Sequence, residues 1–230
     1  MANQWTQFWQ NAHGFDKIMR LNTVLFAKKI QQLFNISSED KILDIGCGPA
    51  YLEDFFAKKV KNITALDVSS DYVKSGQEKF KQFDSVQFLQ IDPNDYLNFE
   101  VIKDQKFSKI VVMSVIQYFK NTEEVEKLIL EMQKVSQQGG ILIIADIIVQ
   151  DGALQDVISL FGRAIRHGFL LAFFQFVLYA RFSSYYQLRN KLLKISVQDL
   201  QKIIQKMGLK AEIMDNLTIH AERKNLVIYF

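Results

Sequence analysis

The feature that most constrains this chain is the sequence KILDIGCGPAYLEDFF at residues 41–56. A short apolar run ends in Asp44 and Ile45, two glycines follow at positions 46 and 48, and a segment of helical character comes next. Glycine allows a sharp turn and a close approach of the backbone to a ligand, and the first amides of a helix have no partner inside the helix. The segment therefore predicts a buried strand, a ligand-binding loop and a helix, in that order.

Similar apolar runs recur along the chain and are separated by longer segments of helical period. This alternation is typical of a parallel sheet with crossover helices. The strands are expected at residues 41–45, 63–67, 86–91, 109–114, 141–148, 210–215 and 225–230, and the helices at 51–59, 70–83, 122–136 and, after a Ser196 cap, up to Met207. Ligands of such sheets bind beyond the carboxyl ends of the strands, so functional residues are expected there.

The length of 230 residues predicts a single domain. We expect an N-terminal helical lid at 1–35, a core with the glycine loop at 36–150, a helical insertion or cap at 151–195, and a closing helix and strands at 196–230. The overall class is α/β, with a doubly wound, seven-stranded and mostly parallel sheet. The lid and the insertion together are expected to form a small helical cap.

Composition excludes several classes of protein. A formal charge of +3 without a concentrated basic patch argues against a nucleic-acid partner, and the single cysteine rules out an internal disulfide. The N-terminus does not resemble a signal peptide, so a cytoplasmic location is expected. The apolar run at 169–180 is too short to span a bilayer. Its flanking arginines leave peripheral membrane contact as a minority hypothesis, and its exposure would favour a homodimer.

Two classes of ligand compete for the glycine loop. A dinucleotide fingerprint needs a third glycine three residues after the second, but that position holds Tyr51. Asp44 would also place a negative charge beside a pyrophosphate, whereas a cationic ligand gains from a carboxylate nearby. The loop therefore favours a cation over a nicotinamide dinucleotide, although an oxidoreductase on a similar sheet remains the rival enzyme class.

The segment LDIGCGPAYL resembles the first motif of class I S-adenosylmethionine-dependent methyltransferases, with Ala50 in place of the usual third glycine. Three further segments, ITALDVSSDYV, VQFLQIDPND and KIVVMSVIQYF, are similar to the motifs that follow in that family. The resemblance implies a Rossmann-like methyltransferase fold, in which Asp67 binds the ribose, Val68 lies against the adenine and Asp92 accepts from its amino group. The implied S-adenosylmethionine site comprises Asp44, Gly46, Cys47, Gly48, Asp67, Val68, Asp92, Pro93 and Ser114.

Catalysis of methyl transfer needs mainly correct positioning of the acceptor, although a base would help to deprotonate a hydroxyl. We expect His13 of the N-terminal segment and His167 of the insertion as candidate bases, with Tyr118 lining the acceptor cavity. His220 precedes the last expected strand and is expected to lie away from the acceptor. No metal is expected, because no acid follows the fourth strand before Glu123.

The acceptor is expected to be a hydrophobic or aromatic small molecule that is methylated on oxygen. Aromatic residues gather in the two segments that should cover it, which predicts an apolar pocket; they include Trp5, Phe8, Trp9, Tyr185 and Tyr186. The alternatives are methylation of nitrogen or carbon on another small molecule or a lipid, and a non-catalytic subunit that only binds the cofactor.

Overall fold

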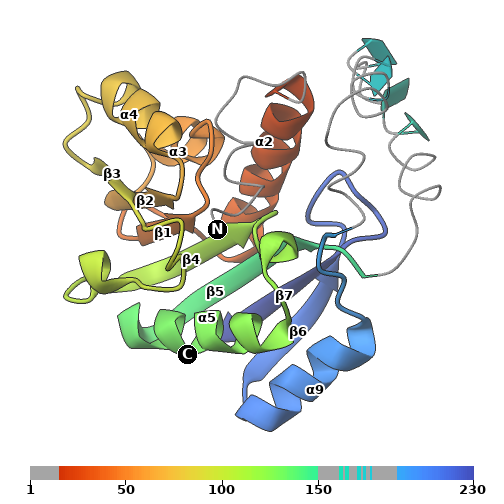
Figure 1. Ribbon diagram of the computed structural model, residues 1–230. Helices are drawn as coiled ribbons and strands as arrows, with labels where there is room; N and C mark the ends of the chain where they lie inside the picture. Colours follow the sequence, from red (N-terminus) through yellow and green to blue (C-terminus); the bar gives the residue numbers. More distant parts are fainter. Residues whose placement is uncertain are drawn as a thin grey trace.

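The computed structural model of the protein describes residues 16–149 and 191–230, together with positions 161, 162, 164, 165, 170, 171, 173, 174 and 177. In the described part of the chain, one sheet has the strand order β3-β2-β1-β4-β5-β7-β6 (Figure 1). Neighbours among β1 to β5 are parallel, and β7 is antiparallel to both β5 and β6. The predicted doubly wound, mostly parallel sheet is therefore confirmed. The strands are β1 (Lys41–Ile45), β2 (Asn62–Asp67), β3 (Val86–Gln90), β4 (Phe107–Met113), β5 (Ser136–Ile147), β6 (Lys210–Asp215) and β7 (Lys224–Tyr229).

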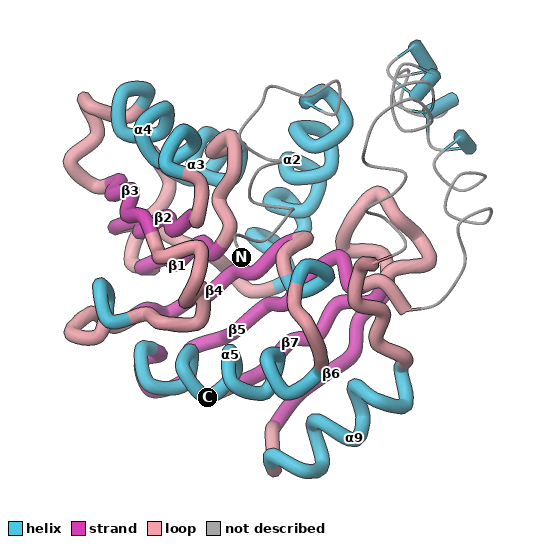
Figure 2. Tube along the Cα trace, viewed as in Figure 1, coloured by secondary structure: helices cyan, strands magenta, loops and turns pink. Residues whose placement is uncertain are grey.

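Helices cover both faces of this sheet. In the view of Figure 2, α2, α3 and α4 lie above the strands, and α5 and α9 lie below them. One buried apolar cluster joins α2 and α3 to the sheet, and a larger one joins α5 and α9 to the opposite face. The helices are α2 (Asp16–Leu33), α3 (Tyr51–Phe56), α4 (Ser70–Lys79), α5 (Thr122–Val135) and α9 (Val197–Met207), with short 3-10 helices η1 (Glu100–Ile102) and η2 (Ile116–Tyr118).

Side-chain caps explain where several helices begin. The Ser69 hydroxyl accepts from the Tyr72 amide ahead of α4, the Asn121 carbonyl oxygen accepts from Glu124 ahead of α5, and the Ser196 hydroxyl accepts from Asp199 ahead of α9. Gly208 ends α9 in the left-handed conformation, with φ of 63°. The predicted cap and stop of α9 are thus confirmed, whereas α3 and α4 end three and four residues earlier than expected, because turns at 57–60 and 80–83 lead into β2 and β3.

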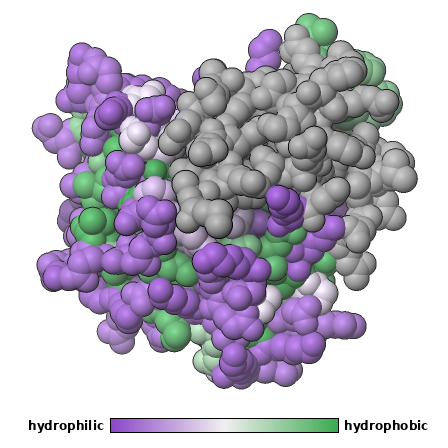
Figure 3. All heavy atoms as spheres, viewed as in Figure 1, coloured by the Kyte–Doolittle hydropathy of each residue, from purple (hydrophilic) through white to green (hydrophobic). Residues whose placement is uncertain are grey.

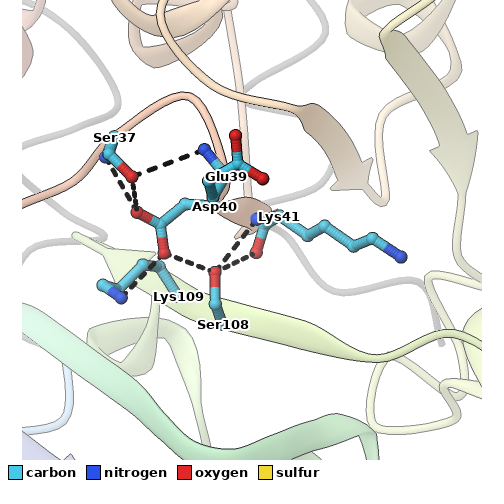
Figure 4. Close-up of polar contacts among 6 residues, drawn as sticks. All are labelled: Ser37, Glu39, Asp40, Lys41, Ser108 and Lys109. Carbon is cyan, nitrogen blue, oxygen red and sulfur yellow. Dashed lines mark hydrogen bonds and ion pairs between the residues drawn. The ribbon is translucent and has the colours of Figure 1, made fainter.

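A polar cluster fixes the amino ends of β1 and β4 (Figure 4). The Asp40 carboxylate accepts from the Ser108 hydroxyl at 2.7 Å, the Lys109 ammonium at 2.8 Å and the Ser37 amide at 2.8 Å. Burial tends to raise the pKa of Asp40, but these donors outweigh it and hold the pKa below its ordinary value. This buried carboxylate cluster stabilises the edge of the sheet opposite the glycine loop.

Some large apolar side chains between positions 161 and 174 are exposed. They include Leu171 at 71%, Ile165 at 57% and Phe174 at 54% exposure. Figure 3 shows hydrophobic atoms at the upper right, where Figure 1 draws this part of the chain. No helix within the described residues is long and apolar enough to cross a membrane. Peripheral membrane contact and dimerisation through this patch stay predictions.

Candidate functional site

The glycine loop follows β1 at the carboxyl edge of the sheet. The amides of Gly46 and Cys47 both donate to the Leu66 carbonyl, which ties the loop to β2. Gly46 has φ of 77°, and a Cβ at this position would lie 2.3 Å from Cγ2 of Val115. Gly46 is therefore required both for its conformation and for its close approach to the end of β4.

Gly48 and Ala50 complete the turn in the left-handed region, with φ of 51° and 61°. A Cβ on Gly48 would meet no atom within 4 Å, so the missing side chain leaves open space beside the loop. Ala50 adopts this conformation despite its methyl group, which costs on the order of 1 kcal/mol. The alanine that replaces the usual third glycine of the resembled motif therefore keeps the backbone shape that the motif needs.

Asp67 at the end of β2 is buried and holds the loop in place. One carboxylate oxygen accepts from the Gly48 amide at 2.9 Å, and the other accepts from the Ser69 amide at 2.8 Å. Burial raises the pKa of Asp67, and these amides oppose the increase. Each carboxylate oxygen can accept a second hydrogen bond, so Asp67 retains the capacity to bind a ligand hydroxyl.

Asp44 and Glu53 form a buried pair of carboxyl groups below the loop. Burial raises the pKa of Asp44 from 3.8 to about 7; an interaction with Glu53 opposes this increase, and the charge of Asp67 adds to it. Burial and the charge of Asp44 raise the pKa of Glu53 well above its ordinary value. Neither Glu53 oxygen makes a hydrogen bond within the described structure. The described residues place no basic group beside Asp44 or Asp67, so a cation bound in the cavity would favour the ionised forms of these two acids.

A single cavity extends from this loop to the carboxyl ends of β4 and β5. Asp44, Cys47 and Asp67 line one end, and apolar residues from α2, the loop after β3, β4 and α5 form its walls. The other end is polar. Ser114, Asp146, His220 and Arg223 line this end, and Thr218 bonds to Asp146 behind them. We call these five residues the Asp146 cluster.

The Asp146 carboxylate is the centre of this cluster. It accepts from the Ser114 hydroxyl at 2.5 Å, the Arg223 guanidinium at 2.9 Å and the Thr218 hydroxyl at 3.1 Å. Burial would raise the pKa of Asp146, but Arg223, then His220 and the two hydroxyls, outweigh burial and hold the pKa below its ordinary value. Asp146 is therefore a buried, ionised carboxylate at the end of the cavity away from the glycine loop.

The expectation that His220 lies away from the acceptor side is wrong. His220 lines the same cavity as Asp44 and Ser114. The reason lies in the strand order: because β7 is antiparallel to both of its neighbours, β6 runs parallel to β5. The loop after β6 therefore reaches the same carboxyl edge as the loops after β4 and β5.

The remaining predicted residues have different placements. Cys47, Val68, Pro93, Ser114 and Tyr118 line the cavity together with Asp44, Gly46, Gly48 and Asp67. The Asp92 side chain is exposed and accepts from the Asn94 amide at 2.8 Å, in a turn beside the cavity; its adenine role stays a prediction. His13 and His167 lie outside the described residues.

Sequence reasoning missed several cavity residues besides His220, among them Asp146, Arg223 and Asn22. Asp146 is an acid within the apolar run ILIIADIIV, and that contrast is the signal that could have identified it. Arg223 and Asn22 belong to segments without a recognisable motif. They reach the cavity only through the packing of α2 and the loop before β7.

Comparison with known proteins defines the class. Residues 36–167, more than half of the chain, match the model of a family described as a methyltransferase domain. The chain belongs to this family. Its fold and relatives identify it as an S-adenosylmethionine-dependent methyltransferase.

Relatives and solved structures agree with this class at low identity. A malonyl-[acyl-carrier protein] O-methyltransferase of Hamiltonella defensa is 21% identical over 202 residues, which cover 87% of this chain and 73% of that protein. Other curated methyltransferases are matched over half of their length or less. The YcgJ protein of Bacillus subtilis has a TM-score of 0.56 at 16% identity, covering 83% of this chain and 70% of the other. The N-methyltransferase NodS of Bradyrhizobium japonicum, in complex with S-adenosylhomocysteine, has a TM-score of 0.52 at 17% identity, covering 88% and 85%.

The residues present fit S-adenosylmethionine as the cofactor. Its sulfonium and amino groups are cationic, and Asp44 and Asp67 line the cavity as buried acids whose ionised forms a cation stabilises. The open space at Gly48 leaves room for the ligand against the backbone. The cofactor supplies a methyl group activated for transfer to a nucleophile.

Proposed function

We propose that the protein methylates a hydroxyl group on a hydrophobic or aromatic small molecule, with S-adenosylmethionine as the methyl donor. The observation that carries this proposal is the combination of apolar walls and a polar, ionised end in a single cavity. An apolar acceptor fits the walls, and its hydroxyl group fits the hydrogen-bonding groups at the Asp146 cluster. The similarity to an O-methyltransferase supports the choice of oxygen.

The walls of the cavity favour a flat or chain-like apolar acceptor. Tyr96 and Phe119 stack with ring centroids 5.5 Å apart, and both line the cavity, as do Phe99 and Met113. The Tyr96 hydroxyl donates to Glu124 at 2.6 Å, which fixes the orientation of its ring. A sugar would leave its hydroxyls unpaired against these surfaces, so we expect sugars to be poor acceptors.

Support for a cap over the acceptor comes from the described positions of the insertion. Ala164 and Phe173 are buried in one apolar cluster with Ile18 of α2 and Ile219 of the loop before β7. Ile18 also lines the cavity. We infer that the insertion and the first turns of α2 exclude water from the acceptor end, which strengthens the electrostatic interactions there.

Gln117 of η2 is a further candidate for contact with the bound ligands. Its side chain is buried and lines the cavity, and its Oε1 has no hydrogen-bond partner within the described structure. A buried amide oxygen without a partner costs free energy that a donor on a ligand would recover. We infer that Gln117 accepts a hydrogen bond from the cofactor or the acceptor.

The test has a binding step and a transfer step. Titration calorimetry with S-adenosylmethionine, S-adenosylhomocysteine and NADH should show binding of the first two only, and Asp67→Ala should weaken that binding while the exposed control Asp71→Ala does not. Release of S-adenosylhomocysteine is then measured with phenols, long-chain alcohols, amines, carboxylic acids, sugars and RNA.

Phenols or long-chain alcohols should react fastest. Turnover restricted to amines, carboxylic acids or RNA would refute the hydroxyl assignment. Binding of the adenosyl compounds without turnover of any acceptor would favour the non-catalytic alternative. Binding of NADH alone would refute the cofactor site.

A further inference from the structure

The Asp146 cluster lies at the end of the cavity opposite the acids that suit a cation. Three segments that are distant in the sequence converge here: the end of β4 with Ser114, the end of β5 with Asp146, and the loop between β6 and β7 with His220 and Arg223. None of these side chains belongs to the glycine loop. Their convergence on one carboxylate needs another explanation.

We propose that His220 is the catalytic base that removes the proton of the acceptor hydroxyl, and that the buried Asp146 carboxylate stabilises the imidazolium that forms. This inference rests on the proposed methylation of a hydroxyl group. It replaces His13 and His167 with a histidine that lines the described cavity.

The charges around His220 suit a base. Asp146 is close enough for the two side chains to influence each other's charge, and Arg223 bonds the same carboxylate at 2.9 Å. A carboxylate alone would favour the protonated imidazole, and a guanidinium alone would disfavour it. The imidazole of His220 therefore lies beside one group of each sign, and the Asp146 carboxylate can stabilise the positive charge that the ring gains with a proton. The groups that α2 and β4 contribute here, Asn22 and Ser114, are uncharged.

The loop that carries His220 is held from several sides. The Asn22 side chain of α2 accepts from the Ile219 amide at 2.8 Å, and the Thr218 hydroxyl accepts from the His220 amide at 3.3 Å. The Asn225 side chain accepts from the Asp146 amide at 3.0 Å. These bonds fix the backbone on both sides of the pair, as a catalytic geometry requires.

Backbone strain occurs at the two strand ends that meet in the cluster. Ser114 has φ of 57° and Asp146 has φ of 66°, which is unfavourable for residues with a Cβ. Such strain costs on the order of 1 kcal/mol or more at each position and collects at functional sites. The Ser114 hydroxyl donates to the Asp146 carboxylate at 2.5 Å, so the two strained backbones place these side chains in direct contact.

The proton transfer balances without a further reactant. The acceptor oxygen forms a bond to the methyl carbon while the bond from that carbon to sulfur breaks and leaves its electron pair on sulfur. The hydroxyl proton passes to His220. Nδ1 of His220 is buried, so we assign the transfer to Nε2. The imidazolium formed is stabilised by Asp146 and later releases its proton to water.

The experiment follows the ring signals of labelled histidine by NMR in the protein saturated with S-adenosylhomocysteine. The chain contains three histidines, so His220→Gln assigns the signal of residue 220. Asp146→Asn should lower the proton affinity of His220 by about tenfold or more, because the carboxylate is lost while Arg223 remains. Arg223→Gln should raise the proton affinity of His220. If Asp146→Asn does not fold, the result with Arg223→Gln tests the proposal alone.

A carboxylate outside the Asp146 cluster serves as the control for this titration. Asp215→Asn removes an exposed carboxylate that pairs with Lys224 and should leave the titration of His220 unchanged. An unchanged titration midpoint in both Asp146→Asn and Arg223→Gln would overturn the pair. Phenol added to the same complex should shift the His220 signal; a shift confined to His13 or His167 would overturn the assignment of the base.

Methyl transfer gives the second readout, with the best hydroxyl acceptor of the panel. His220→Gln should lower kcat by roughly a hundredfold or more and abolish the loss of rate at low pH, with unchanged affinity for S-adenosylmethionine. Glu222→Gln, on the same loop and exposed, should keep the rate of the wild type. A His220→Gln rate within threefold of the wild type would overturn the proposal. Reaction of amines alone would refute the proposed function instead. The NMR titration of His220 would still test its interaction with Asp146 in that case.

Discussion

Replacement of Asp44 by asparagine should make the ligand-free protein more stable and unable to bind its cofactor. The pKa of Asp44 is raised to about 7 in the folded protein, mainly by burial, against 3.8 for an unperturbed carboxyl. Protons are then bound more tightly by the folded chain, so the stability is fully present below pH 3.8 and is lost as the pH rises through about 7. Asparagine has nearly the same shape and cannot ionise.

The size of the effect follows from the two pKa values. Asp44→Asn should gain about 2 kcal/mol of unfolding free energy at pH 5 and about 4 kcal/mol at pH 8.5. Urea unfolding followed by circular dichroism at the two pH values measures this gain, with Asp215→Asn as the exposed control. An equal gain at both pH values, or a loss of stability at pH 8.5, would refute the reasoning.

The cofactor should narrow the difference in stability between the two proteins. At about 100 times its Kd, S-adenosylmethionine should add about 2.7 kcal/mol to the wild type and almost nothing to Asp44→Asn. The ionised form of Asp44 attracts the cation, so the affinity of the wild type should rise as the pH increases through about 7. Calorimetry between pH 6 and pH 8.5 checks this direction. An affinity that falls over this range would show that the cation does not bind near Asp44.

Three further predictions concern the scaffold. Gly46→Ala should abolish cofactor binding in calorimetry, because its Cβ would lie 2.3 Å from Val115, and Val115→Ala in the same chain should restore part of it. Asp40→Asn should cost about 1 to 3 kcal/mol in urea unfolding at pH 7 and leave cofactor affinity unchanged; the contribution of Asp40 should be lost as the pH falls below 3.8, since its pKa is lowered. Ser196→Ala should cost about 1 kcal/mol by removing the α9 cap.

Much of the fold was predictable because its strands are continuous apolar runs. β1 and β6 have the predicted bounds, and the other strands differ by a few residues at their ends. β5 begins earlier than expected, at Ser136, because it continues directly from α5 and pairs there with Phe107. A hydrophobic pattern indicates which residues are buried, but it does not indicate where a helix gives way to a paired backbone.

The cofactor end of the site was more predictable than the acceptor end. Asp44, Gly46 and Asp67 belong to short motifs at the ends of two predicted parallel strands. Their positions in the sequence therefore predict that they lie together at the carboxyl edge of the sheet. His220 reaches the cavity only because β7 lies between β5 and β6, which periodicity does not reveal. Glu53 has the spacing of an ordinary helical residue, and its burial against Asp44 depends on how α3 packs on the sheet.

The position of β7 has a consequence for how this chain folds. β7 follows β6 in the sequence but lies between β5 and β6 in the sheet, so β6 has no hydrogen-bonded neighbour until β7 has inserted. Until then β5, rich in isoleucine, is an open edge of the kind that recruits other chains and promotes aggregation. A fragment ending before Lys224 would retain the glycine loop and yet expose that edge. Chaperone dependence and proteolytic sensitivity should therefore concentrate in the final hairpin, far in sequence from the cofactor motif.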